Sequence, residues 1–193
     1  MEEKNRMARA REQQETRQED VVDLLLRQHE RIRLLFAEVL DAEGEQRGES
    51  FQRLVRLLAV HETAEEMVVH PQARPSFAGG ESVVDALLLE EREAKEVLSE
   101  LDRMGPDAPD FERKLIKLRD MVLAHAAHEA QYEFPGLRQG HDPGRLRLMA
   151  QAVRAAEAMA PGVEADIAVG SLASLIDHTR DVVQNVMEGR SPS

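Results

Sequence analysis

Two stretches of the chain place histidine and glutamate at the same spacing. Residues 61–71 read HETAEEMVVHP and residues 125–135 read HAAHEAQYEFP, so each has a histidine, a glutamate four positions later and a proline six positions after that. In a helix, side chains four positions apart lie one turn apart on the same face. Imidazole and carboxylate can bind a cation together once they are deprotonated. The two stretches therefore predict a cation site between two helices, each of which ends at its proline.

Four segments carry apolar residues at alternating spacings of three and four, which predicts amphipathic helices. Their apolar stripes run over 22–39, 54–68, 84–101 and 115–132, with turn-forming residues between them. A shift of 62 residues aligns the first segment with the third, and a shift of 64 aligns the second with the fourth. The sequence predicts an all-α fold, an up-down-up-down four-helix bundle built from two repeated helical hairpins.

Composition divides the chain into three parts. Residues 1–19 are nearly all charged or polar and predict a disordered or frayed extension, because they bury too little apolar surface to offset the ordering entropy. Residues 20–140 hold the bundle, and residues 141–193 form a C-terminal helical extension with helices expected over 144–159 and 170–189. The apolar stripes of these two helices predict packing against the bundle, with a homodimer through them as the alternative.

Net charge and composition limit the partners. The 193 residues carry a formal charge of −12, which argues against nucleic acid or an anionic membrane surface. The chain has no cysteine, so disulfides and thiolate metal sites are excluded. No apolar run approaches the roughly 20 residues that cross a bilayer, and the N-terminus lacks the apolar stretch of a signal peptide. We expect a cytoplasmic protein without nucleic-acid or membrane partners.

Ionisable residues interrupt the apolar stripe of every predicted helix. A buried histidine or carboxylate without a partner costs several kcal/mol, and a bound cation can compensate this cost. Six nitrogen and oxygen donors exceed what one tetrahedral zinc ion takes and suit iron or manganese, and two glutamates at equivalent positions of the hairpins can bridge a pair of ions. The predicted metal ligands are His29, His61, Glu65, Glu91, His125 and Glu129.

This ligand pattern, with a His-x-x-x-Glu motif in the second and fourth helices, resembles the hemerythrin-like (HHE cation-binding) family over roughly residues 20–140. The resemblance implies a non-haem centre of two iron ions, bridged by two carboxylates and by an oxo or hydroxo group. It implies that dioxygen, nitric oxide or peroxide is bound, sensed or consumed. A non-catalytic iron-binding or iron-sensing module that signals through the C-terminal helices is the alternative, so enzymatic activity stays open.

Glu91 departs from the family, which usually has histidine on the third helix. A hard oxygen ligand stabilises ferric iron, so this residue disfavours reversible dioxygen carriage and favours oxidase-like, peroxide-consuming or sensing chemistry. A helical structural protein without metal is a third hypothesis. Zinc hydrolysis is disfavoured, because HETAE lacks the second histidine of a His-Glu-x-x-His site.

Glu62 and Glu90 are candidates for an additional ligand or for an outer-sphere group. Glu62 follows His61, and a His-Glu-x-x-Glu variant resembles the iron-sensing hemerythrin domain of an animal ubiquitin ligase, in which the glutamate next to the histidine is a ligand. Glu90 would replace Glu91 as the inward residue after a small register shift.

Tyr132 is a third such candidate, since it lies about one turn beyond Glu129 and is expected to point into the core. Its hydroxyl would then ligate metal or lie in the outer sphere, although core packing is the ordinary role of such a residue. His70 and His128 are expected at the surface or at a helix end.

Overall fold

The computed structural model describes residues 19–159, 172–188 and 190, so the predicted N-terminal extension over 1–19 lies almost wholly outside the described residues. The described part is helical and contains no strand, which confirms the predicted all-α class. In chain order the elements are α2 (Val21–Asp41), α3 (Gly44–Ala64), the π-helical turn η1 (Glu65–Val69), α4 (His70–Ala73), α5 (Gly80–Met104), α6 (Phe111–His128), the π-helical turn η2 (Glu129–Glu133), α7 (Phe134–Gly140), α8 (Pro143–Met159) and α9 (Leu172–Met187).

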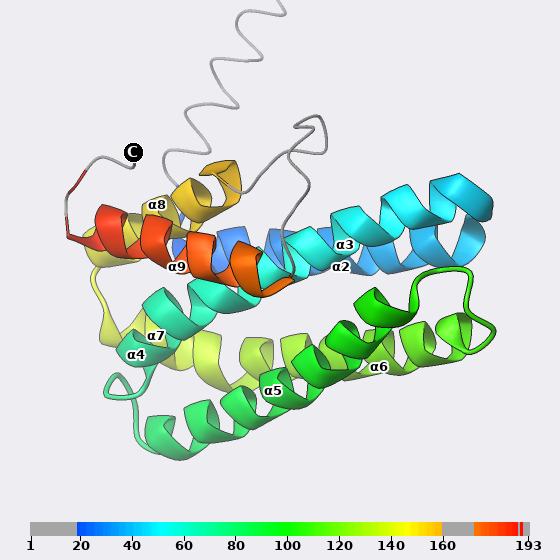
Figure 1. Cartoon of the computed structure of the whole chain (residues 1–193). Helices are drawn as coiled ribbons and strands as arrows, with labels where there is room; N and C mark the ends of the chain where they lie inside the picture. Colours follow the sequence, from blue (N-terminus) through cyan, green and yellow to red (C-terminus); the bar gives the residue numbers. More distant parts are fainter. Residues whose placement is uncertain (1–18, 160–171, 189, 191–193) are drawn as a thin grey trace, which may run out of the picture.

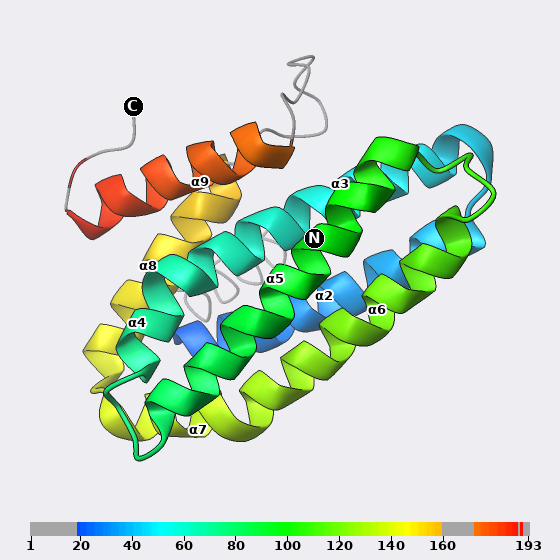
Figure 2. The same cartoon turned by 60° about the horizontal axis from the view of Figure 1, so that its bottom comes forward.

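Two helical hairpins form the bundle. Helices α2 and α3 are joined by two residues, and α5 and α6 by a short loop, so the partners in each pair run antiparallel. Figure 1 shows the α2–α3 hairpin above the α5–α6 hairpin, and Figure 2 shows the same four helices from below. The side chain of Asp20 caps α2 by accepting a hydrogen bond from the Asp23 amide at 3.0 Å.

The apolar core consists of two clusters on either side of a polar layer. In α2, the buried apolar residues within 21–25 belong to one cluster and those within 32–39 to the other. In α5, Val84 belongs to the first cluster and the buried apolar residues within 94–101 to the second. Phe51 and Phe111 pack edge to face in the second cluster, with ring centroids 4.9 Å apart. The polar residues of each helix therefore meet at one level, between two apolar ends.

The C-terminal helices pack against the first hairpin. Helix α8 contacts α2 and α3, and α9 contacts α3 and α8, with Met149, Val153 and Val183 buried in the first apolar cluster. Figure 1 shows both helices on the side of α2 and α3 that faces away from the second hairpin. This is the packing that the apolar stripes predicted, and a homodimer stays a prediction.

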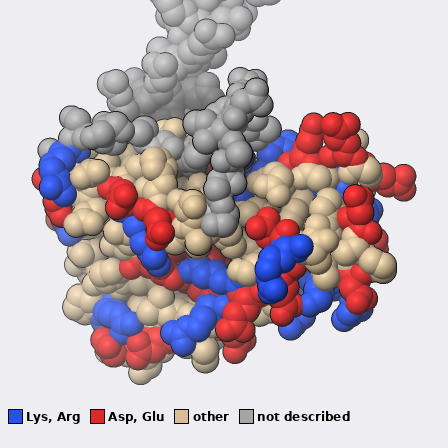
Figure 3. Space-filling model, viewed as in Figure 1, with Lys and Arg blue, Asp and Glu red and all other residues tan. Residues whose placement is uncertain are grey.

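None of the helices in the described ranges is both long and apolar enough to span a bilayer. Basic and acidic side chains are interspersed on the face shown in Figure 3.

The two prolines of the repeated motifs do not end their helices as predicted. The turns η1 and η2 begin at Glu65 and Glu129, and in both the amide five residues later donates to the carbonyl of that glutamate. Pro71 and Pro135 then lie in the first turn of α4 and α7. A proline is tolerated in the first turn of a helical segment, where its missing N–H is least costly, so the chain continues beyond it.

Candidate metal centre

The structure brings the six predicted ligands together in the polar layer, from all four sides of the bundle. Helix α2 supplies His29, α3 supplies His61, and η1 begins with Glu65. The second hairpin contributes in the same way from α5, α6 and the start of η2. The exposed fraction is at most 7% for five of the six, and His29 is half-buried. The residues of the second hairpin are Glu91, His125 and Glu129.

The ligand atoms form two groups that share one carboxylate. In the first group, donor atoms of four residues lie within 4.8 Å of one another, and in the second group those of three residues do. Glu65 belongs to both groups. The first group is His29, His61, Glu65 and Glu129, and the second is Glu65, Glu91 and His125.

Glu129 also faces both sides of the centre. Its Oε2 lies 3.2 Å from Nε2 of His29, and its Oε1 lies 3.6 Å from Nε2 of His125. Glu65 has Oε2 at 3.3 Å from Nε2 of His61 and Oε1 at 3.9 Å from Nε2 of His29. The two glutamates that begin the π-helical turns thus lie between the histidines.

Buried ligand atoms in this layer lack hydrogen-bond donors among the described residues. Both carboxylate oxygens of Glu65 and both of Glu129 are fully buried and accept no hydrogen bond, and Nε2 of His125 has no hydrogen-bond partner. Such groups cost several kcal/mol unless a charge or donor compensates them. The atoms that would ligate a metal are nitrogen and oxygen, without sulfur. Such a set fits iron or manganese better than a structural zinc site. The residues therefore fit a bound cation.

The pKa shifts reflect the crowding of like charges. Burial raises the pKa of Glu65 well above its ordinary value, and the carboxylates of Glu129 and Glu91 add to the shift. Burial alone would also raise the pKa of Glu129, but His125 and His29 lower it below the ordinary range. Burial lowers the pKa of His61, and His29 lowers it further. A cation would favour the deprotonated form of every one of these groups.

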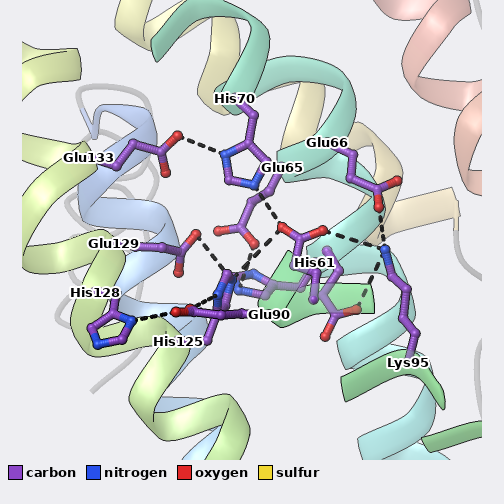
Figure 4. A network of polar contacts seen from close by, with 12 residues as sticks. His61, Glu65, Glu66, His70, Glu90, Lys95, His125, His128, Glu129 and Glu133 are labelled. Carbon is purple, nitrogen blue, oxygen red and sulfur yellow. Dashed lines mark hydrogen bonds and ion pairs between the residues drawn. The ribbon is translucent and has the colours of Figure 1, made fainter. Parts of the chain in front are cut away.

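Acceptors outside the layer hold the second ring nitrogen of two histidines. Nδ1 of His61 lies 2.9 Å from Oε1 of Gln28, and Nδ1 of His125 lies 3.1 Å from Oε2 of Glu90. The other oxygen of Glu90 lies 2.7 Å from Nδ1 of His128. Figure 4 shows Glu90 between these two histidines. An acceptor at Nδ1 puts the ring proton there and leaves the lone pair of Nε2 directed into the centre.

Glu91 and Glu90 differ in burial. Glu91 is 1% exposed, whereas the side chain of Glu90 is 33% exposed and lies in neither group. The register shift that would turn Glu90 inward in place of Glu91 does not occur, and Glu90 contacts His125 from outside.

His70 and Glu133 are the residues that the sequence interpretation missed. His70 lies at a helix end as expected, as the first residue of α4, but it is 1% exposed, so its expected surface position is wrong. Its Nε2 lies 2.7 Å from Oε1 of Glu91. Its Nδ1 lies 2.7 Å from Oε1 of Glu133 (Figure 4). Burial would lower the pKa of His70, but the hydrogen bonds to Glu133 and Glu91 raise it to about 10. A protonated His70 therefore bridges two buried carboxylates.

The π-helical turns explain this miss and the outward position of Tyr132. A wide turn adds one residue before the helix continues, which rotates the following side chains by roughly 100° relative to an α-helical register. Tyr132 is 50% exposed, so its expected inward position is wrong, and Glu133 is fully buried in its place. The matched prolines were the available signal for a changed register, because a proline inside a helix interrupts its hydrogen-bond ladder.

Glu62 is buried but lies outside both groups. It is 4% exposed, and Nζ of Lys95 lies 3.7 Å from its Oε2. Burial raises the pKa of Glu62 to about 8, the charge of Glu91 adds to the shift, and Lys95 opposes it. Nζ of Lys95 also lies 3.5 Å from Oε2 of Glu91. Glu62 and Lys95 thus form a polar border on the α5 side of the centre.

Comparisons with known proteins agree with this arrangement. A family model described as the hemerythrin HHE cation-binding domain matches residues 20–137. A protein named DNA nickase from Nostoc sp. (strain PCC 7120) is 27% identical over 139 residues, which are 72% of this chain and only 39% of that protein. The crystal structure of a hemerythrin HHE cation-binding domain-containing protein from Mycobacterium kansasii is similar, with a TM-score of 0.61, 18% identity and coverage of 89% of this chain and 95% of that chain. At this identity the last similarity shows the fold alone.

Proposed function

The chain belongs to the hemerythrin HHE cation-binding family, and from that membership we propose that it is a non-haem di-iron protein that binds, senses or reacts with peroxide, dioxygen or nitric oxide. The observation that carries the proposal is the set of four carboxylate oxygens of Glu65 and Glu129, which are buried between histidines without a hydrogen-bond donor in the described chain. Two cations would neutralise them from both sides.

Each residue then has a defined task. His29 and His61 would hold one ion, Glu91 and His125 would hold the other, and Glu65 and Glu129 would serve both. An iron pair supplies electrons and open coordination positions for a small ligand. The flanking apolar clusters exclude bulk water from the layer.

The oxygen ligand Glu91 directs the choice among these activities. Nζ of Lys95 lies 3.5 Å from one oxygen of its carboxylate, and Nε2 of His70 lies 2.7 Å from the other. An anionic oxygen ligand favours the ferric state, so we propose reaction with peroxide or sensing of an oxidant in preference to reversible dioxygen carriage.

Metal analysis and rapid mixing test the proposal. We expect two irons per chain by elemental analysis of protein reconstituted with ferrous iron under anaerobic conditions. Mixing with peroxide should change the visible absorption and consume peroxide, and His125→Ala should abolish the consumption. Metal content below one ion per chain, with either iron or manganese, contradicts the proposed centre. Repeated, fully reversible cycles with dioxygen contradict the preference for peroxide.

An iron-sensing module is the second candidate, and the packing of the C-terminal helices favours it. Helices α8 and α9 both contact η1, the turn that begins with Glu65. A sensor would bind iron, consume no peroxide, and change the rate at which proteases cut the region after residue 143. If the protein consumes peroxide rapidly and iron leaves the rate of proteolysis unchanged, the peroxide-consuming function is favoured over the sensor.

The relative named as a DNA nickase calls for a separate assay. A net charge of −12 opposes binding to a phosphate backbone. We therefore expect iron-loaded protein to leave supercoiled plasmid intact at physiological salt. Nicking that is lost in His125→Ala would assign this activity to the chain and contradict our expectation.

A further inference from the structure

A chain of hydrogen bonds connects the C-terminal helix α8 to one of the proposed ligands. Nε2 of Gln28 on α2 donates to Oε2 of Glu157 on α8 at 3.2 Å, and Oε1 of the same amide lies 2.9 Å from Nδ1 of His61. Gln28 is 4% exposed and His61 is 3% exposed. Glu157 lies outside the region that the family model matches, which ends at residue 137. A residue of the C-terminal extension therefore reaches the metal layer through one side chain.

The charge of Glu157 determines how the amide is oriented. A carboxylate only accepts hydrogen bonds, so the NH₂ group of Gln28 must face α8 and its carbonyl oxygen must face His61. The carbonyl oxygen also only accepts, so the ring proton of His61 must be on Nδ1. The lone pair of Nε2 is then directed into the layer, where it lies 3.3 Å from Oε2 of Glu65.

The other oxygen of Glu157 is also held by α2. Arg31 lies 3.5 Å from Oε1 of Glu157, so the two oxygens contact two residues of α2. This pair fixes the carboxylate over Gln28. The apolar stripe of α8 packs on the same part of the bundle, so the contact forms only while α8 is docked.

In the second hairpin, the group that accepts from the histidine needs no outside residue to orient it. The residue equivalent to Gln28 under the 62-residue shift is Glu90, which accepts from His125 directly. Both oxygens of a carboxylate accept, so either orientation of Glu90 leaves the proton of His125 on Nδ1. An amide can instead turn its NH₂ group toward the histidine, and at Gln28 the acceptor Glu157 disfavours that orientation.

We propose that Glu157 is a positioning residue of the metal centre, and that docking of α8 and binding of iron at the His29–His61 side stabilise each other. This inference rests on the proposed function, because it requires metal at that side. The coupling is reciprocal: iron should hold α8 in place by the same factor by which a docked α8 raises the affinity for iron. The C-terminal extension is therefore part of the centre.

Three variants of the full chain test the coupling. Glu157→Ala removes the acceptor, Glu157→Gln keeps an acceptor oxygen, and Arg154→Gln is the matched control. Arg154 lies one turn earlier on α8 and pairs at 2.6 Å with Glu19, away from the histidines. Two measurements are made on each protein: anaerobic titration with ferrous iron, and hydrogen exchange of the α8 amides with and without iron.

In the unmodified chain, iron should slow hydrogen exchange in α8. Glu157→Ala should bind iron about 10-fold more weakly at one of two positions, and iron should no longer protect α8. Glu157→Gln should recover most of the affinity, and Arg154→Gln should behave as the unmodified chain does. A simple loss of helix packing would lower α8 protection in both Glu157→Ala and Arg154→Gln without changing iron affinity.

The outcomes separate the inference from the proposed function. If the unmodified chain takes up iron and Glu157→Ala binds it equally tightly, the inference fails and the di-iron proposal stands. If iron leaves α8 exchange unchanged in the unmodified chain, the coupling is absent. If the unmodified chain takes up no iron, both proposals fail.

Discussion

The two hairpins carry the same motif but offer different ligand atoms to a metal ion. On the α2–α3 side the predicted ligands that belong to that hairpin are two imidazoles and a carboxylate, whereas the α5–α6 side has one imidazole and two carboxylates. The 62-residue shift aligns His29 with Glu91 as the residues that differ. Of the two proposed metal positions, the one on the α2–α3 side is thus nitrogen-rich and the one on the α5–α6 side is oxygen-rich. This predicts that the two positions bind metal with unequal affinity.

The two positions that differ, His29 and Glu91, also contact different kinds of residue. His29 stacks on Phe134, with ring centroids 5.9 Å apart, and Glu91 instead accepts a hydrogen bond from His70. The 64-residue shift that aligns the two motifs also aligns His70 with Phe134. An imidazole packs against an aromatic ring, whereas a buried carboxylate requires a donor. The comparison teaches that the type of residue at the ligand position in one hairpin goes with the type of residue that follows the π-helical turn of the other hairpin.

The largest effect is expected from removing a ligand that both sides share. Glu65→Ala should weaken binding of both ions by more than roughly 100-fold, since even outer-sphere changes cost 10- to 100-fold. His125→Ala removes a ligand of the oxygen-rich side alone, so about one ion should remain per chain. Anaerobic titration with ferrous iron followed by elemental analysis measures both. Equal losses in the two variants would mean that the sides do not bind separately.

A stability measurement tests the pairing of each ligand with its neighbour. His70→Phe copies the residue of the other hairpin and leaves Glu91 and Glu133 buried without this donor, so the free energy of unfolding should fall by about 3–5 kcal/mol. Phe134→Leu is the control and should cost at most about 1.5 kcal/mol. Urea unfolding of metal-free protein gives both values. A His70→Phe variant as stable as the unmodified chain would refute the donor role of His70.

The smallest effect concerns the contact that joins the two hairpins at one end. Asp20 caps α2 and accepts hydrogen bonds from Arg138 of α7 at 3.0 and 3.1 Å. Partial burial would raise the pKa of Asp20, but the hydrogen bonds from Arg138 and from the Asp23 amide lower it. Stability from a lowered pKa is present above the unfolded value, about 3.9, and is lost as pH falls through the folded value.

Asp20→Ala should therefore lower the free energy of unfolding by about 1 kcal/mol near neutral pH, as the removal of other N-caps does. The difference in stability between the variant and the unmodified chain should shrink below about pH 4. Thermal unfolding at a series of pH values measures it, and Asp20→Asn, which keeps a capping oxygen, is the control. A difference that stays constant down to pH 2 would show that the charge of Asp20 has no part in it.

Periodicity predicted the bundle and identified the six candidate ligands, because ionisable residues stand out in an apolar stripe. It failed after Glu65 and Glu129, where the wide turns change the register, so His70, Tyr132 and Glu133 were misplaced or missed. The contact from Glu157 to Gln28 spans 129 residues, and no local pattern encodes it. The spacing of residues in the sequence predicts which face of a helix each residue lies on. Contacts between residues that are far apart in the sequence can be identified only in the packed structure.

The position of the polar layer between two apolar clusters bears on how the protein matures. Each end of the bundle has its own hydrophobic packing, so the scaffold can fold before any ion arrives. Small zinc domains, by contrast, need metal in order to fold at all. Under the proposed function, iron would then bind to a protein that is already folded. The supply of iron would control how many sites are occupied without controlling the amount of folded protein.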